Sequence, residues 1–126
     1  MADEIRSYRD LRVYQKTYAL GLEVYKVTRG FPTSERFALS QQLRRCAVPV
    51  PSNIAEGYGR GSRPDYIRFL KIARGSLSEL DTQLSFGADL GYLTRDKHRE
   101  LSAEATDSSK MLNALIRSLG NEGGTS

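Results

Sequence analysis

Hydrophobic residues recur at steps of three and four along most of the chain, which is the spacing of amphipathic α-helices. The most regular repeat lies in residues 63–91, with inward positions at Tyr66, Leu70, Ala73, Leu77, Leu80, Leu84 and Gly87. Residues 94–119 follow the same heptad spacing through Leu101, Ala105, Ser108, Leu112, Leu115 and Leu119. Both segments are therefore predicted to be helices that turn one face toward a shared core.

The segment 9–29 is also predicted to be helical, but it has two apolar stripes. One stripe consists of Leu11, Tyr14, Tyr18, Leu22 and Tyr25, and the other of Val13, Leu20, Val24 and Val27. At 100° per residue the two stripes lie nearly opposite each other, whereas a helix of a small bundle usually buries one face. The second face is predicted to contact another subunit. The alternative is a scatter of β-branched residues on the surface.

Residues 34–57 form the remaining predicted helix, which contains two prolines. Its apolar stripe runs through Leu39, Leu43, Ala47, Val50 and Ile54. Pro49 and Pro51 each remove a backbone donor and clash with the preceding turn, which argues against a straight helix. The helix either kinks near residues 48–50 or breaks and restarts with Asn53 and Glu56 as a capping pair. The unbroken apolar register favours the kink.

Short connections separate these four helices. Gly30-Phe31-Pro32, the glycine-rich residues 57–61 and Gly91 interrupt the helical pattern, and Ser62 and Thr94 are predicted N-caps. Hydrophobic and polar residues seldom alternate one by one along the chain, as they would in a half-buried strand, so a sheet is not expected. The predicted fold is all-α, an antiparallel up-down-up-down four-helix bundle with a proline-kinked second helix. Residues 1–120 would form this single domain and residues 121–126 a flexible polar tail.

Composition fits a globular domain. The chain has 126 residues, of which 27% are charged and 39% hydrophobic. Its single cysteine, Cys46, excludes an intrachain disulfide and favours a reducing compartment, so we expect a cytoplasmic protein. No apolar run approaches the roughly 20 residues that cross a bilayer, and no membrane role is expected.

Positive charge is concentrated in the middle of the chain. Residues 36–74 contain eight basic and two acidic side chains, a net charge of +6, whereas the rest has 11 basic and 13 acidic ones, a net charge of −2. A charge distribution this uneven favours a polyanionic partner.

The predicted nucleic-acid site uses this basic stretch. Arg44 and Arg45 end the first half of the second helix, and Arg68, Lys71 and Arg74 share a face of the third. In an antiparallel hairpin the two clusters are expected to meet, with Arg60 and Arg63 at the loop end. Such contacts reach phosphates of RNA or DNA without reading sequence. Two alternatives are an interaction scaffold, whose arginines meet acidic residues of a partner protein, and a solvated surface with internal ion pairs.

No catalytic group is predicted, so we expect a non-enzymatic protein without cofactor or metal. His98 is the only histidine and has no paired carboxylate or cysteine beside it. Cys46 is either a small core residue or a thiol made reactive by the arginines before it. The glycines at 57–61 match neither the dinucleotide-binding fingerprint nor the P-loop, although a helix start beside them would suit a phosphate.

Motifs spread over residues 8–119 resemble the small four-helix proteins encoded within intervening sequences of bacterial 23S ribosomal RNA genes. The resemblance is carried by Tyr14-Gln15-Lys16, Phe31-Pro32, Gln42-Leu43-Arg44-Arg45-Cys46-Ala47-Val48, Pro51-Ser52-Asn53-Ile54-Ala55-Glu56-Gly57, Arg68-Phe69-Leu70, Ala73-Arg74-Gly75-Ser76 and Leu90-Gly91-Tyr92-Leu93. The chain departs from the family pattern at Pro49, where a small polar residue is usual.

The resemblance implies a helical bundle and an assembly, but no catalytic residue. The family is similar to the accessory protein of diversity-generating retroelements, a ring of five four-helix bundles that binds a reverse transcriptase and nucleic acid. A homopentamer, and a reverse transcriptase or other protein as partner, are therefore expectations that come from the resemblance alone.

Overall fold

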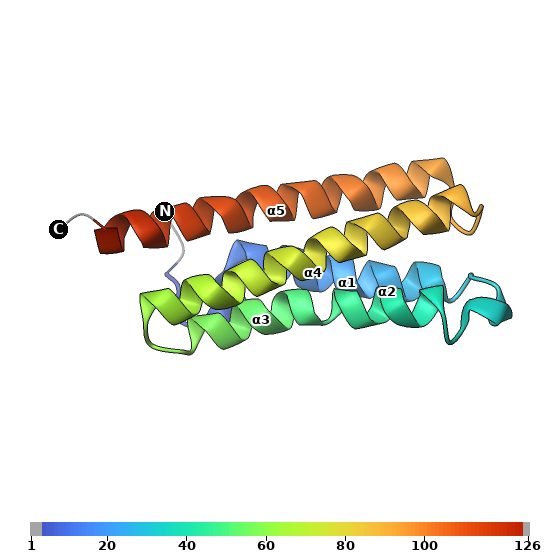
Figure 1. Ribbon diagram of the computed structural model, residues 1–126. Helices are drawn as coiled ribbons and strands as arrows, with labels where there is room; N and C mark the ends of the chain where they lie inside the picture. Colours follow the sequence, from blue (N-terminus) through green and yellow to red (C-terminus); the bar gives the residue numbers. More distant parts are fainter. Residues whose placement is uncertain (1–3, 125–126) are drawn as a thin grey trace.

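The structure is a computed structural model, and it describes residues 4–124. Its elements are the 3-10 helices η1 (Tyr8–Asp10) and η2 (Thr33–Glu35) and the α-helices α1 (Arg12–Thr28), α2 (Leu39–Ala47), α3 (Pro49–Tyr58), α4 (Arg63–Asp89) and α5 (Arg95–Gly124). Residues 4–124 contain no strand, which confirms the all-α prediction. Figure 1 shows α2 and α3 end to end below α4, with α5 along the other side of α4.

The core is built from the predicted heptad positions. Leu70, Leu77 and Leu84 of α4 and Leu101 and Leu112 of α5 are buried.

The two stripes of α1 have different surroundings. The core side consists of Val13, Leu20 and Val24, whereas the other stripe leaves Tyr18, Leu22 and Tyr25 exposed. The structure thus leaves a large apolar face of α1 uncovered in a single chain.

The second predicted helix is divided into α2 and α3 at one residue, Val48. Val48 keeps helical dihedral angles, φ −67° and ψ −42°, and its carbonyl accepts a hydrogen bond from the Ser52 amide at 3.2 Å. The Asn53 side-chain amide donates to the Pro49 carbonyl at 2.8 Å instead of capping a new helix. The helical path therefore continues through the prolines as the predicted kink.

Two predicted helix ends need correction. Regular helix begins at Leu39 and not at residue 34, because Ala38 has non-helical angles (φ −121°, ψ −108°). The Glu35 carboxylate accepts the Leu39 amide at 3.2 Å and the Tyr92 hydroxyl at 2.9 Å, which holds this irregular segment in place. At the other end, α5 continues past residue 119 to Gly124.

Glycine conformation explains why α5 does not end at Gly120. Within the described residues, the left-handed φ that closes a helix occurs at Gly61 (84°) and Gly91 (82°) but not at Gly120. Residues 121–124, predicted as part of a polar tail, thus belong to α5, and residues 125–126 lie outside the described part. The predicted N-caps are confirmed: Ser62 Oγ accepts the Asp65 amide at 3.3 Å, and Thr94 Oγ1 accepts the Lys97 amide at 3.1 Å.

Helices α3 and α4 approach most closely at Gly57. A Cβ added there would lie 2.8 Å from the Phe69 Cβ and 3.2 Å from the Tyr66 carbonyl oxygen. Such a distance is far below the 3.5–4.0 Å or so that carbon atoms prefer. A residue without a side chain is therefore required where α3 crosses the start of α4.

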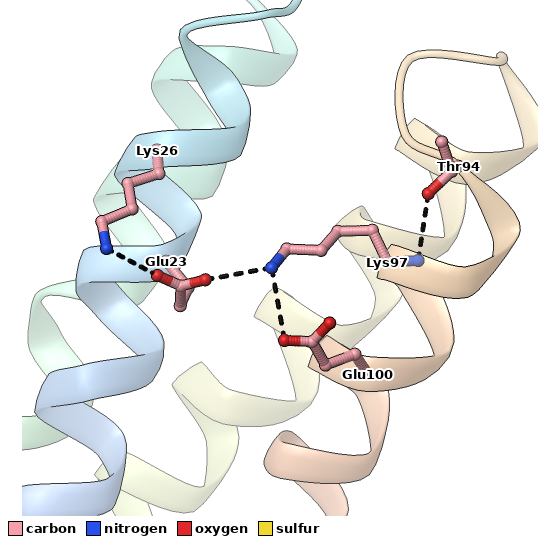
Figure 2. Close-up of polar contacts among 5 residues, drawn as sticks. All are labelled: Glu23, Lys26, Thr94, Lys97 and Glu100. Atoms are coloured by element: carbon pink, nitrogen blue, oxygen red, sulfur yellow. Dashed lines mark hydrogen bonds and ion pairs between the residues drawn. The ribbon is translucent and has the colours of Figure 1, made fainter.

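A small ion-pair network joins α1 to α5 (Figure 2). The Lys97 ammonium lies 3.0 Å from one oxygen of the Glu23 carboxylate and 3.3 Å from Glu100, while Lys26 binds the other Glu23 oxygen at 3.0 Å. Hydrogen bonds from Lys26 and Lys97 lower the pKa of Glu23, and the bond to Glu23 raises the pKa of Lys97.

Candidate nucleic-acid interface

The predicted meeting of the two basic clusters is wrong. Across the α2–α4 contact, the Cys46 thiol donates to the Glu79 carboxylate at 3.6 Å and the Gln83 amide to Gln42 at 3.4 Å. These pairs place residues 44–45 level with residues near 80 of α4, about two helical turns beyond Arg74. Hydrophobic spacing does not specify the register of a hairpin, which depends here on its turn and on the bend at Val48.

Lys71 and Arg74, two α4 members of the predicted site, have different surroundings. Arg74 turns toward α5, where its guanidinium donates to the Asn113 side-chain oxygen at 2.9 Å. Lys71 is exposed on α4. Arg74 is therefore partly engaged inside the bundle.

At the turn between α3 and α4, acidic side chains offset the positive charge. Arg60 lies 3.6 Å from Glu56 and 3.9 Å from Asp65, and Arg68 lies 3.5 Å from Asp65. Both guanidinium groups stack over the Phe69 ring, at 5.2 and 4.5 Å. Arg63 is exposed on the first turn of α4. This end of the bundle holds three of the seven predicted residues, namely Arg60, Arg63 and Arg68, and both Arg60 and Arg68 have carboxylate partners.

Arg44 and Arg45 belong to a groove between α1 and α2. We call it the arginine groove; it encloses about 470 Å³ and is lined by Tyr25, Arg36, Phe37, Gln41, Arg44, Arg45 and Val48. Three of these seven side chains are cationic and none is acidic. Phe37 is 79% exposed, so an aromatic ring beside the arginines is open to solvent.

Two of the three arginines of this groove, Arg36 and Arg44, lie over aromatic rings. The Arg44 guanidinium lies 4.9 Å above the Tyr25 ring and donates to the Thr28 hydroxyl at 3.0 Å. The Arg36 guanidinium lies 5.4 Å above Phe37. In the part of the chain that the structure describes, none of the groove arginines forms an ion pair with a carboxylate. Their charges are therefore available to an anionic ligand.

Five groove residues were not predicted as site residues: Tyr25, Arg36, Phe37, Gln41 and Val48. Arg36 falls inside the basic stretch, and the neighbouring Phe37 lies off the apolar stripe of the predicted helix. A cation next to an aromatic ring outside the core pattern could therefore have indicated these two residues as part of the site. Tyr25 belongs to the outer stripe of α1. Nothing in the sequence indicated that this stripe passes beside Arg44.

A second, larger groove runs along the uncovered face of α1. It encloses about 630 Å³, and its lining includes Tyr14, Tyr18, Leu22, Tyr25, Val48 and Pro51. We call it the tyrosine groove. Its walls are more strongly apolar than those of the arginine groove, and the two share Tyr25 and Val48.

The two side chains considered for catalysis, Cys46 and His98, have different surroundings. Cys46 is buried, and burial, followed by the Glu79 carboxylate, raises the pKa of its thiol. A raised pKa keeps the sulfur protonated and poorly nucleophilic, which favours the core interpretation. His98 is half-buried, with Nε2 3.3 Å from the Ser85 hydroxyl. Among the described residues, no group of three His, Cys, Asp or Glu side chains gathers where it could hold a metal ion.

None of the described helices is both long enough and apolar enough to cross a bilayer.

Comparisons with known proteins agree with the fold. A crystal structure of a protein of unknown function from the S23 ribosomal protein family of Bacteroides thetaiotaomicron VPI-5482 is similar, with a TM-score of 0.77 and 24% identity. The alignment covers 83% of this chain and 95% of that one. No curated protein matches the sequence. The family model described as 23S rRNA-intervening sequence protein matches residues 9–114. The chain therefore belongs to the 23S rRNA-intervening sequence protein family.

Proposed function

We propose that this protein is a non-enzymatic nucleic-acid-binding protein that contacts phosphates through basic residues from the middle of its chain. The observation that carries the proposal is the arginine groove, where Arg36, Arg44 and Arg45 converge and no acidic side chain lines the walls. Arginine forms bidentate hydrogen bonds with phosphate, and contacts of this type provide affinity without base selection. Arg63 and Lys71 add exposed positive charge on α4, apart from this groove.

Salt dependence tests the proposal. Fluorescence anisotropy would measure binding of a labelled oligonucleotide at several salt concentrations, for the wild type and for the double variant R36A/R45A. Each neutralised phosphate contributes roughly 0.7–0.9 to the log–log salt slope, so the double variant should flatten the slope by up to about two.

The matched control is K110A/R117A, which removes the same charge from two exposed positions of α5. It should leave the slope within about half a unit of the wild type, because those side chains line neither groove. Absence of binding by the wild type at low salt, or equal losses in the two double variants, would contradict the proposal.

Self-association would strengthen such binding. We propose that the helices run up-down-up-down and that several copies form a ring, five by the family resemblance, with the tyrosine groove at the contact. The support is the exposed apolar face of α1, where Tyr18 and Leu22 are each 51% exposed. A ring repeats weak phosphate contacts and thereby raises avidity.

A protein-scaffold function is the second candidate. The mainly apolar tyrosine groove supports it, because a partner protein such as a reverse transcriptase could bury the same face of α1. In that case the arginines would meet acidic side chains of the partner. A cytoplasmic location stays a prediction from the single cysteine.

A further inference from the structure

We propose that the arginine groove binds single-stranded nucleic acid in preference to duplex, by stacking unpaired bases on Phe37 and Tyr25 while its arginines hold the phosphates. The inference rests on the proposed function and names the form of nucleic acid that this site accepts. It arises from the combination of rings and cations in one groove, which the basic charge alone does not provide.

The exposure of Phe37 is the first step. A phenylalanine that is 79% exposed leaves most of its apolar surface in water, and it lies in the irregular segment before α2. Every nucleobase has a flat face that can cover such a ring, and stacking of this kind tolerates any base. In a duplex the faces of the bases are already stacked on each other, so the ring has no partner there.

The arrangement of the cations is the second step. Arg36 stacks on Phe37 and Arg44 on Tyr25, so each ring has a guanidinium plane within about 5.5 Å of its centre. The planes of arginine side chains also accept stacked bases. Arg45 adds a third charge from the exposed side of α2, so phosphates between neighbouring bases have a cation near them.

The turn between α3 and α4 offers a contrast. It also combines arginines with an aromatic ring, but Arg60 and Arg68 together cover Phe69, which is only half-exposed, and Asp65 pairs with both. A base approaching Phe69 would have to displace these groups. In the arginine groove a single guanidinium lies over each ring, Phe37 is 79% exposed, and no acidic side chain lines the walls.

The test compares single-stranded dT12 with a 12-base-pair duplex in anisotropy titrations at one low salt concentration. Phe37→Ala should weaken binding of dT12 about tenfold and change duplex binding less than twofold, because one stacked base is lost. Phe37→Tyr keeps a ring and should bind dT12 like the wild type. Circular dichroism would verify that each variant keeps its helix content.

The matched control is Phe86→Ala on α4, which removes another exposed ring, at 59% exposure, that does not line the groove. It should bind both probes like the wild type. Equal affinity of the wild type for the two probes, or unchanged dT12 binding by Phe37→Ala, would overturn the inference. The proposed phosphate binding would still stand in that case if R36A/R45A flattened the salt slope. Failure to bind either probe, with binding of labelled polyglutamate instead, would overturn both proposals and identify an acidic protein as the occupant.

Discussion

Replacing Gly57 with alanine tests the close crossing of α3 and α4. The added Cβ would lie 2.8 Å from the Phe69 Cβ and 3.2 Å from the Tyr66 carbonyl oxygen. A Cβ and a carbonyl are fixed to the backbone and cannot rotate away, so the helices must separate by about 0.7 Å or more to restore ordinary contact. Overpacking of this kind costs about 1–3 kcal/mol.

The helix itself favours the substitution, which limits the net effect. Alanine in a helix is about 1 kcal/mol more favourable than glycine. With the steric cost near its upper end, Gly57→Ala should lower the free energy of unfolding by about 1–2 kcal/mol. For a chain of this length, that corresponds to a fall in Tm of about 4–8 °C.

Gly75→Ala is the matched control, because it makes the same chemical change in another helix. A Cβ at Gly75 meets nothing within 4 Å, and the residue is exposed on α4. Only the helix preference then acts, so this variant should gain about 0.5–1 kcal/mol. Thermal and urea unfolding followed by circular dichroism would measure both variants. A Gly57→Ala protein as stable as Gly75→Ala would refute the close packing inferred here.

Three further predictions concern the core, the ion pairs and the assembly. Leu70→Ala empties a fully buried position and should cost about 2–5 kcal/mol in urea unfolding, whereas Ile72→Ala, at a 43% exposed position, should cost about 1 kcal/mol or less. Because the pKa of Glu23 is lowered, its stabilising effect is present above the ordinary value of 4.5 and is lost as the pH falls through the folded-state pKa. The urea midpoints of wild type and Glu23→Gln should therefore differ at about pH 7 and converge as the pH falls below the lowered pKa of Glu23, and a constant difference would contradict this. Light scattering should give a mass above the 14.1 kDa monomer for the wild type and a monomer mass for Leu22→Lys, which puts a charge in the tyrosine groove. The control Leu90→Lys, at an exposed position outside that groove, should keep the mass of the wild type. A monomeric wild type would contradict the ring.

The candidate site was only partly predictable. The concentration of charge in residues 36–74 indicated the right part of the chain, because charge counts need no structure. Which cations share a surface depends on how far one helix is shifted along another. Arg44 and Arg45 were expected beside Lys71 and Arg74, but the contacts of α2 with α4 place them about two turns away, and Tyr25 of α1 became their neighbour instead.

The sequence by itself determined the helices and the inward face of most of them. Heptad spacing identified the buried positions of α4 and α5, and the predicted caps at Ser62 and Thr94 formed as expected, because periodicity and capping act within a few residues. Tertiary structure decided what local rules cannot specify. It selected the valine stripe of α1 for the core, brought α3 against α4 at Gly57, and gathered Tyr25 of α1, Arg44 of α2 and Arg36 of the turn before α2 into one groove. Each of these depends on contacts between residues distant in sequence, whose geometry is set only when the helices pack together.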